Sequence, residues 1–468
     1  MMNKKINILI VHYNTPKLTE CLVKSINKFV GANCTIYIFD NSDKNPFRYK
    51  QDNIVLFDNT QGQIINFENW LEQFTKKGNV AAADGGRRIS ARHCISVDKC
   101  FDLINDNFIL LDSDILLKKD ISVLYDDKYL FCGQLEKNLK NIIRLTPYLC
   151  FINVNKCKEL NLRYFDKNRM HGLIMGSGNW YDTGAAFYFH ANKYPHNLIK
   201  LDDYIVHYKG ASWDHNYVNN KKVHGELTPD EWIYKHSDLY KDNLKTKVIY
   251  TCITGGYENI VDPSYVQDDF DYICFTDNTN QNSKVWQFRP IPSELQNLSK
   301  IKQQRIIKIC PHKYLPSHYK ESIWVDGAID ILGDMNEFIQ NYCNNPNKSV
   351  YIRKHPKRNC LYIEANICMR MKKDTPTNIY PQIKKYRAQK FPENSGLVES
   401  NIIYRKHNNS YCVRLMNAWA DEIKNGSHRD QLSFNYCLWK IGNSGFQYLD
   451  TKLVNSKYFK WYSHHDRK

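Results

Sequence analysis

Two aspartates separated by one residue, Asp112 and Asp114, follow an apolar run over 108–111. Residues two apart in a strand share a face, so a strand that ends at Asp112 can turn both carboxylates toward whatever lies beyond its end. Carboxylate oxygens are preferred ligands of Mg²⁺ and Mn²⁺, and these cations often bind together with phosphate groups. The pattern therefore indicates a divalent-metal site, and a surface turn with two solvated acids is the alternative interpretation.

Polar residues also follow two earlier apolar runs. Residues 6–11 lead into Asn14, and residues 34–39 lead into Asp40. The expected order of the first half, strand–helix–strand–strand–helix–strand, favours an open parallel sheet. Ligands of such sheets lie beyond the carboxyl ends of the strands, so we expect Asn14, Asp40 and Asp112 on one edge.

The bulk composition bounds the size, the ligand charge and the redox state. The chain has 468 residues, which is too long for one ordinary core, so we expect at least two domains. A formal net charge of +16 fits a polyanionic ligand, and the absence of a basic block favours phosphorylated small molecules over nucleic acid. The 15 cysteines include no C-x-x-C pair, so we expect reduced thiols in a cytoplasmic protein.

A polar, highly charged stretch over 216–246 separates two halves of similar pattern. Its TPDE segment at 228–231 predicts a helix start, with threonine as the cap and proline at the first position. We therefore expect a first domain over 1–215, a charged helical linker over 216–246 and a second domain over 247–468. No window approaches the length of a membrane span, and the N-terminus looks like a first strand rather than a signal peptide, so any membrane contact is expected to be peripheral.

The second half repeats the order of the first. Strands expected over 272–275 and 322–325 end at Asp277 and Asp326, as strands of the first half end at acids. This ordered pattern suggests two copies of one architecture.

The segments VHYNTPKL, FDNSD and LLDSD lie within the first 215 residues. Together they resemble the family-two class of GT-A glycosyltransferases, which are inverting enzymes that use nucleotide-diphosphate sugars. The resemblance implies that Asn14 and Asp40 lie near the nucleoside. It also implies that Asp112 and Asp114 border a metal and the ribose-diphosphate.

The same resemblance implies further site residues. Arg88 and Arg92 lie where this family approaches the donor, and guanidinium groups suit phosphate oxygens. Inverting transfer needs a base for the acceptor hydroxyl, and we nominate Asp182, which precedes an apolar strand expected over 185–189. A late histidine often completes the metal site of this group, and His207 is the candidate. The alternatives are a solvated helix start for the arginines, a turn role for Asp182 and a structural role for His207.

Seven segments follow one another over nearly all of 248–440: IYTCITGGYENI, DYICFTDN, KICPHKYLP, SIWVDGAI, RKHPKRNCLYIEA, GLVESNIIYRKHN and HRDQLSFNYCLWK. They resemble the glycosyltransferase-like domain found in bacterial polysaccharide loci and in plant proteins linked to cell-wall mucilage. Both halves are therefore expected to be α/β, as two GT-A domains of the Rossmann-like, nucleotide-diphospho-sugar transferase type with mostly parallel central sheets.

This second resemblance and the repeated pattern imply a second donor site. Asp326 is its expected metal ligand. Residue 328 is alanine, so Asp330 as a substitute ligand and weaker metal binding both remain open. Asp430 begins a helix and is expected to face the acceptor, with helix capping as the alternative. The donor-binding residues expected here are Asp277, Lys308, His312, His355 and Arg358.

Together these features predict a bifunctional glycosyltransferase that extends a surface polysaccharide such as capsule, O-antigen or lipooligosaccharide. Mn²⁺ or Mg²⁺ and basic side chains would stabilise the departing nucleoside diphosphate. The expected partners are nucleotide sugars, an oligosaccharide or lipid-linked glycan acceptor and the inner-membrane surface, without nucleic acid. The alternatives are one catalytic domain beside a non-catalytic acceptor-binding module, a non-enzymatic carbohydrate-binding protein, and a nucleotidyltransferase.

Overall fold

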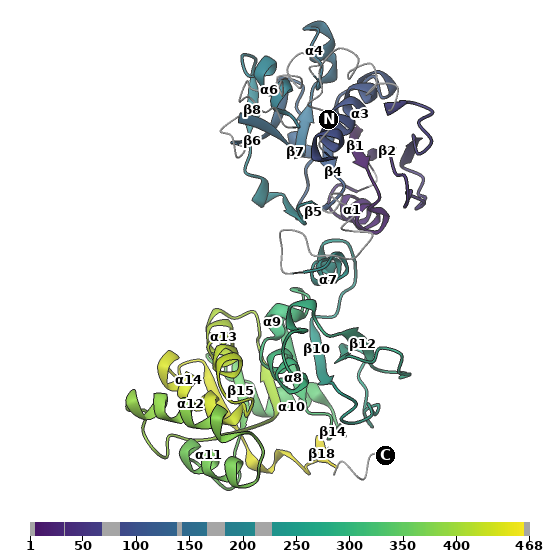
Figure 1. The fold of residues 1–468 in the computed structure, drawn as a ribbon. Coiled ribbons are helices and arrows are strands. Elements are labelled where there is room, and N and C mark those ends of the chain that lie inside the picture. The colour runs from purple at the N-terminus through teal and green to yellow at the C-terminus, as the bar shows by residue number, and fades with distance from the viewer. Residues whose placement is uncertain are drawn as a thin grey trace. The chain divides into compact units, whose positions relative to one another are not determined.

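The structure is a computed structural model that describes residues 5–31, 33–67, 85–137, 143–165, 183–210 and 227–462. Over 85–91 it describes the backbone but not the side chains. The chain divides into two compact units, Met1–Asp242 and Asn243–Lys468 (Figure 1). Each unit is built on its own seven-stranded sheet.

The sheet of the first unit has the order β3-β2-β1-β4-β7-β6-β8. Every residue of β1 is buried because this central strand contributes to a core on each face of the sheet. Ile8 and Ile10 enter one core, and Leu9 and Val11 enter the other. The strands of this sheet are β1 (Ile6–His12), β2 (Cys34–Asp40), β3 (Ile54–Asp58), β4 (Phe108–Asp112), β6 (Phe131–Lys137), β7 (Ile143–Ile152) and β8 (His196–Leu198).

One helix of the first unit replaces an expected strand. Residues 185–189 lie in a helix, α6, that follows Gly184 in the left-handed conformation. A Cβ atom on Gly184 would lie 1.9 Å from the carbonyl oxygen of Leu145, so the chain enters α6 pressed against β7. A short apolar run does not distinguish a buried strand from a buried helix. The described helices of this unit are α1 (Pro16–Phe29), α3 (Gly85–Leu103), α4 (Val154–Glu159), α6 (Ala185–Ala191) and α7 (Pro229–Lys235).

The helix α7 begins where the sequence predicts it. Thr228 and Glu231 form a capping box, with proline at the first helical position. Trp232 and Ile233 join the core of the first unit, where α7 contacts α1. In its described part, 227–242, the segment expected as a linker is therefore packed as part of the first unit.

The sheet of the second unit has the order β12-β11-β10-β13-β16-β15-β17. Its strands are β10 (Lys247–Ile253), β11 (Phe270–Thr276), β12 (Gln287–Pro290), β13 (Glu321–Val325), β15 (Val350–Lys354), β16 (Val398–Arg405) and β17 (Phe446–Leu449). Its helices are α8 (Lys300–Ile309), α9 (Pro311–Tyr314), α10 (Met335–Tyr342), α11 (Leu361–Arg370), α12 (Pro376–Ala388), α13 (Ser410–Asn425) and α14 (Gln431–Ile441).

The two sheets share one topology. In each, four strands run parallel side by side, two antiparallel pairings follow, and the last strand joins in parallel. Each unit also has a two-stranded antiparallel ribbon beside the sheet. In the first unit β5 (Ile115–Leu117) pairs with β9 (Ile205–His207), and in the second β14 (Ile329–Ile331) pairs with β18 (Phe459–Trp461). The predicted α/β class with mostly parallel sheets is confirmed in both units.

Two further features bear on the sequence-based expectations. All 15 cysteines are buried free thiols. Within the ranges that the structure describes, every helix is too short or too polar to cross a membrane.

Candidate active sites

Asp112, Asp114 and His207 converge at the edge of the first unit's sheet. Asp112 ends β4, and Asp114 immediately precedes β5. Because β5 pairs antiparallel with β9, His207 stands opposite Ile115. Nε2 of His207 lies 2.9 Å from Oδ1 of Asp114, and one ligand atom from each of the three residues lies within 4.8 Å of the others. The structure thus brings together the three residues that the sequence assigned to a metal.

Backbone N–H groups hold the two aspartates of this cluster in place. The two carboxylates together give the cluster excess negative charge. Oδ2 of Asp114 accepts a hydrogen bond from the backbone N–H of Gly210, and Oδ1 of Asp112 accepts one from that of Ser113. Burial and the neighbouring Asp114 raise the pKa of Asp112 to about 7. Burial opposes protonation of His207, but Asp114 outweighs it and raises the pKa of His207. Two crowded carboxylates and an imidazole are a donor set that fits a divalent cation such as Mn²⁺.

Asn14 and Asp40, expected near the nucleoside, instead hold the loop that follows β2. Asp40 is fully buried, and each of its oxygens accepts a hydrogen bond from a backbone N–H within 42–47. Asn14 is also buried, and its side-chain oxygen accepts from two backbone N–H groups of the same loop. Because these oxygens are already satisfied, we correct the expectation: both residues shape the loop rather than contact a nucleoside.

Arg92 reaches the space beside Asp112. Its guanidinium lies 5.3 Å from the centre of the Phe67 ring, and Arg92 and Asp112 line the same small cavity of about 50 Å³. The side chains of Arg88 and Asp182 lie outside the described residues, so their donor-binding and catalytic roles stay predictions.

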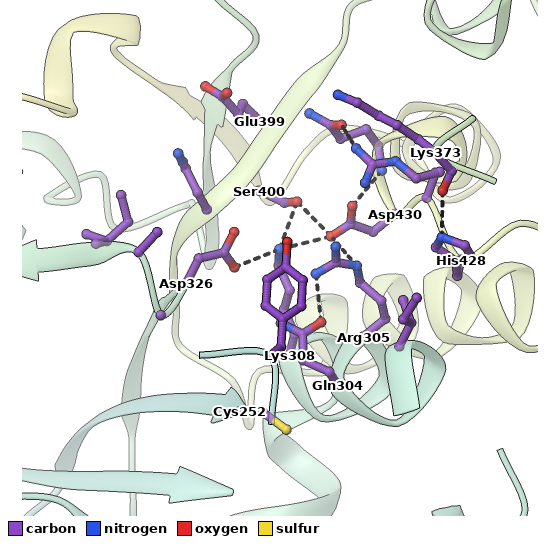
Figure 2. Close-up of a pocket in the computed structure, with 18 of the residues that line it drawn as sticks. Cys252, Gln304, Arg305, Lys308, Asp326, Lys373, Glu399, Ser400, His428 and Asp430 are labelled. Carbon is purple, nitrogen blue, oxygen red and sulfur yellow. Dashed lines mark hydrogen bonds and ion pairs between the residues drawn. The ribbon is translucent and has the colours of Figure 1, made fainter. Parts of the chain in front are cut away.

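The second unit has a cavity of about 670 Å³ at the equivalent edge of its sheet (Figure 2). Its walls come from the turn after β10, from α8, from the turn after β13 and from the start of α14. This volume is in the range of small-molecule sites. The ionisable side chains that line it are Glu258, Lys300, Arg305, Lys308, Asp326, His355, Arg358, Glu364, Lys373, Glu399, His428, Arg429 and Asp430.

Lys308 lies between two acids of this cavity, and its side chain is only 1% exposed. Its Nζ atom is 3.2 Å from Oδ1 of Asp326 and 2.9 Å from Oδ2 of Asp430. It also donates a hydrogen bond to Oγ of Ser400 at 3.0 Å (Figure 2). Three acceptors therefore occupy the three N–H donors of the ammonium group, which is held in one position.

Asp430 is a buried anion rather than an exposed base. It is 3% exposed, and its Oδ1 atom accepts from the backbone N–H of Gln431 at the start of α14. Burial opposes ionisation, but neighbouring cations outweigh it and hold the pKa of Asp430 well below its usual range. These cations are Lys308, Arg305 and Arg429. Such a carboxylate is a weak base, so we correct its catalytic assignment: Asp430 positions Lys308.

Asp326 follows its strand as expected, but among the described residues it belongs to no group of three metal-ligating side chains. Its Oδ1 atom accepts from Nε1 of Trp324 at 2.7 Å as well as from Lys308. Both oxygens of the buried Asp330 accept hydrogen bonds from Ser264, so Asp330 does not substitute. Among the described residues, the one group of three metal-ligating side chains at metal-binding spacing lies in the first unit. The metal role expected for Asp326 therefore stays a prediction, with the ammonium of Lys308 beside its carboxylate.

His355 and Arg358 line the cavity as predicted donor-binding residues. Nδ1 of His355 accepts from the backbone N–H groups of Lys357 and Arg358. Burial, together with Arg358, lowers the pKa of His355, so the imidazole is neutral near pH 7. Nε of Arg358 donates to Glu364 at 2.5 Å, which orients the guanidinium.

The other two predicted residues, Asp277 and His312, are not among the lining residues. Asp277 accepts from the backbone N–H of Gly255 and lies 2.9 Å from Nζ of Lys300, which does line the cavity. Asp277 therefore acts on the cavity only through its neighbours. Nε2 of His312 lies 3.0 Å from the side-chain oxygen of Asn417, and we correct its assignment to the donor site.

Several lining residues were not predicted from the sequence. Arg305 precedes Lys308 by one helical turn, a spacing that places both on one face and could have revealed it. Ser400 and Trp461 gave no such signal, because strand pairing alone brings β16 and β18 to the cavity. The missed residues include Arg305, Lys373, Ser400, Arg429 and Trp461.

Comparison with known proteins finds a family match in the second half of the chain. Residues 233–460 match the TOD1/MUCI70 glycosyltransferase-like domain. Over 149 residues, 29% of this chain, the sequence is 25% identical to the "Probable hexosyltransferase MUCI70" of Arabidopsis thaliana. That match spans 25% of the relative, so the chain covers about a quarter of the protein it resembles.

Solved structures similar to this chain are glycosyltransferases with low TM-scores. Mouse xyloside xylosyltransferase 1 in its apo form has a TM-score of 0.30 and 9% identity, over 44% of this chain and 85% of that one. The galactosyltransferase LgtC, in complex with donor and acceptor sugar analogs, has a TM-score of 0.27 and 12% identity, over 42% of this chain and 73% of that one. The glycosyltransferase GlyE of Streptococcus pneumoniae TIGR4 has a TM-score of 0.27 and 12% identity, over 73% of this chain and 90% of that one. Likeness at this level says nothing about activity.

Proposed function

We propose that this chain is a glycosyltransferase with a nucleotide-sugar site in each unit. The cavity of the second unit carries the proposal, because nearly all of its lining residues lie in the stretch that matches the TOD1/MUCI70 domain and it lies beyond the carboxyl ends of parallel strands. Arg305, Lys373 and Arg429 line it, and such cations suit the diphosphate of a nucleotide sugar.

The transfer reaction explains why cations are needed there. The bond between the anomeric carbon and a diphosphate oxygen breaks, and the oxygen keeps the electron pair. A new bond joins that carbon to an acceptor hydroxyl oxygen, whose proton passes to a base. Negative charge therefore develops on the departing nucleoside diphosphate, where fixed cations stabilise it. Within the described part of the chain, Oδ2 of Asp326 makes no hydrogen bond, so it is free to accept one from a sugar hydroxyl.

In the first unit, we propose that Asp112, Asp114 and His207 hold Mn²⁺ or Mg²⁺. A bound cation would supply positive charge opposite the leaving diphosphate. Arg92 lines the same cavity as Asp112 and would bind a phosphate oxygen. Asp182 is the proposed base that accepts the proton of the acceptor hydroxyl in an inverting transfer.

Two donor sites in one chain suit an enzyme that adds two sugars in alternation to a growing glycan. We therefore propose a surface polysaccharide, such as capsule, O-antigen or lipooligosaccharide, as the product. The acceptor would be an oligosaccharide or a lipid-linked glycan. We place the protein in the cytoplasm, and the net charge of +16 supports anionic donors and peripheral contact with the anionic inner membrane.

One observation favours a second candidate, in which only the first unit catalyses transfer and the second binds acceptor. The cavity of the second unit is lined by Trp461 and Tyr257, whose side chains are 49% and 72% exposed. Exposed aromatic rings offer apolar faces with polar edges, which suit the faces of sugar rings. This arrangement fits glycan binding with or without transfer.

Purified full-length protein with a panel of nucleotide sugars and Mn²⁺ separates the two candidates. The proposal expects two donors to be consumed, with Asp112→Ala abolishing use of one and Asp326→Ala abolishing use of the other. Consumption of one donor that only Asp112→Ala abolishes would support the second candidate. Release of pyrophosphate instead of nucleoside diphosphate would refute glycosyl transfer in favour of nucleotidyl transfer.

A further inference from the structure

The two units have the same turn at the same edge of their sheets. The spacing of this turn aligns the residues of one unit with those of the other. In each unit a central parallel strand leads into an aspartate, and a short ribbon strand begins three residues after it. Asp112 therefore corresponds to Asp326, and Asp114 corresponds to Ala328.

The partner strand of the ribbon extends this correspondence to the third ligand. His207 stands opposite Ile115 in the first unit, and Trp461 stands opposite Ile329 in the second. Trp461 thus takes the place of the histidine. Neither Ala328 nor Trp461 can bind a cation through a lone pair, because a methyl group has none and the indole nitrogen only donates. Two of the three ligand positions are lost in the second unit.

A cation nevertheless lies beside Asp326, and it belongs to the protein. Nζ of Lys308 is 3.2 Å from Oδ1 of Asp326 and is also held by Asp430 and Ser400. A metal ion bound to the same carboxylate oxygen would lie close to this buried ammonium, and the two positive charges would repel. The site is therefore built around the lysine.

Other cations of the cavity are placed to meet phosphate oxygens. Lys373 is exposed, and its amino group makes no ion pair within the described ranges. Arg429 lines the cavity and donates to Gln431 through Nη2. Arg305 extends from α8 toward the same space, where Figure 2 shows it near Lys308 and Asp430.

We propose that the second unit binds the diphosphate of its donor without a divalent cation, because Lys308 stands in the cation's place. Arg305, Lys373 and Arg429 then contact the phosphate oxygens. Lys308 neutralises Asp326, so the carboxylate can lie beside a diphosphate without strong repulsion. This inference rests on the proposed function of the second unit and deepens it: one chain combines a metal-dependent donor site with a metal-independent one.

Binding of nucleoside diphosphates to the full-length protein tests the inference. Asp112→Asn with Asp114→Asn disables the first unit, and UDP, GDP, CDP and ADP are titrated calorimetrically with EDTA or with excess Mn²⁺. We expect one of them to bind with a Kd that differs less than about threefold between the two conditions. A Kd that Mn²⁺ lowers by about tenfold or more, with the gain lost in Asp326→Asn, would overturn the inference.

A second pair of variants separates the charge of Lys308 from its effect on folding. Lys308→Met with Asp430→Asn removes the ammonium and its buried counter-charge together, and circular dichroism reports whether the fold is kept. The folded double variant should bind the nucleoside diphosphate about tenfold more weakly or worse, whereas Lys308→Arg should retain binding. Unchanged affinity in the folded double variant would overturn the inference.

A gain of metal dependence provides the converse test. Ala328→Asp with Trp461→His, Lys308→Met and Asp430→Asn rebuilds the ligand set of the first unit without leaving Asp430 as an unpaired buried charge, so Mn²⁺ should now tighten binding. Absence of any response to Mn²⁺ would contradict the alignment of the two turns on which the inference depends. If no nucleoside diphosphate binds to any variant or to the wild type, the proposed function fails as well. Metal-dependent binding by the unaltered second unit would overturn the inference but not the proposed function.

Discussion

Asp112 in the first unit and Asp326 in the second stand at the same point of one topology, yet different groups surround them. Asp112 faces a second carboxylate and His207. Asp326 faces the buried ammonium of Lys308. A shared fold therefore leaves open how the charge at its ligand-binding edge is balanced, and the side chains of each site decide it.

The pKa values of Asp112 in the first site and of Asp430 in the second are shifted in opposite directions. Burial and Asp114 raise the pKa of Asp112, because the first site has excess negative charge. Asp430 is as deeply buried, but its cationic neighbours outweigh burial and hold its pKa well below the usual range. The first site thus favours a cation, and the second has positive charge available for an anion.

The largest effect is expected when the buried ion pair of the second unit, Lys308 with Asp430, is broken. Lys308→Met should lower the free energy of unfolding by about 3–5 kcal/mol, because it leaves Asp430 buried without its closest counter-charge. Urea denaturation at pH 7 measures it. Adding Asp430→Asn should restore at least half of the loss, and Lys302→Met on the same helix serves as a control with little effect. A loss below about 1 kcal/mol would show that the pair is not the centre of the site.

The next effect concerns the acid cluster of the first unit. Asp112→Asn should lower turnover of the metal-dependent donor by about a hundredfold or more, because a neutral amide holds a divalent cation poorly. Turnover of the other donor should not change. Asp202→Asn, at an exposed position of the same unit, is the matched control. Equal loss of both activities would mean that the two sites do not work independently.

Acid should destabilise the second unit through His407. Burial, followed by the charge of Arg405, lowers the pKa of His407 to about 3. Histidine of the unfolded chain titrates near pH 6.5, so between these values the unfolded state binds more protons. The contribution to stability is therefore complete above pH 6.5 and is lost toward pH 3, by up to about 1.4 kcal/mol per pH unit.

Comparison of urea midpoints at pH 7 and pH 5 checks this sign. His407→Leu should flatten the pH dependence of the second unit's transition. In the first unit, the buried His12 has Asp40 at 4.0 Å, which opposes the same lowering, so its transition should respond less. A transition that is equally acid-sensitive in wild type and in His407→Leu would exclude His407 as the cause.

The smallest effect tests which unit includes α7. Thr228→Ala removes the hydroxyl of the capping box and should destabilise the first unit by about 1 kcal/mol, with the second unit unchanged. Thr375 stands at the same position of α12 but makes no side-chain capping bond, so Thr375→Ala is the control with the smaller effect. A shift confined to the second unit's transition would place α7 with that unit.

The positions of the acids were predictable from the sequence, because buried parallel strands must deliver their last polar residues to one edge. That reasoning located Asp112, Asp114 and Asp326, and the late position of His207 added the third member of the cluster. The repeated order of strands predicted two sheets of one type. These features depend on short stretches of sequence.

The chemistry of Asp326 was not predictable, because it depends on residues far apart in the chain. The pairing of β14 with β18 brings Trp461 to the position of a metal ligand, and burial of Lys308 against Asp430 depends on how α8 and α14 pack. Likewise, an aspartate after a strand can face a ligand or bind its own loop. Asp40 binds its loop, and only the hydrogen bonds of both oxygens reveal it.

The central claim is that one chain holds two donor sites at equivalent sheet edges, one dependent on a divalent cation and one on Lys308. The most direct measurement follows consumption of a nucleotide-sugar panel by the full-length protein with Mn²⁺ and then with excess EDTA. We predict that EDTA abolishes use of one donor and leaves use of the other intact, and that Lys308→Met with Asp430→Asn produces the reverse pattern. Loss of both activities in EDTA, or of both in the variant with Lys308→Met and Asp430→Asn, would contradict the claim.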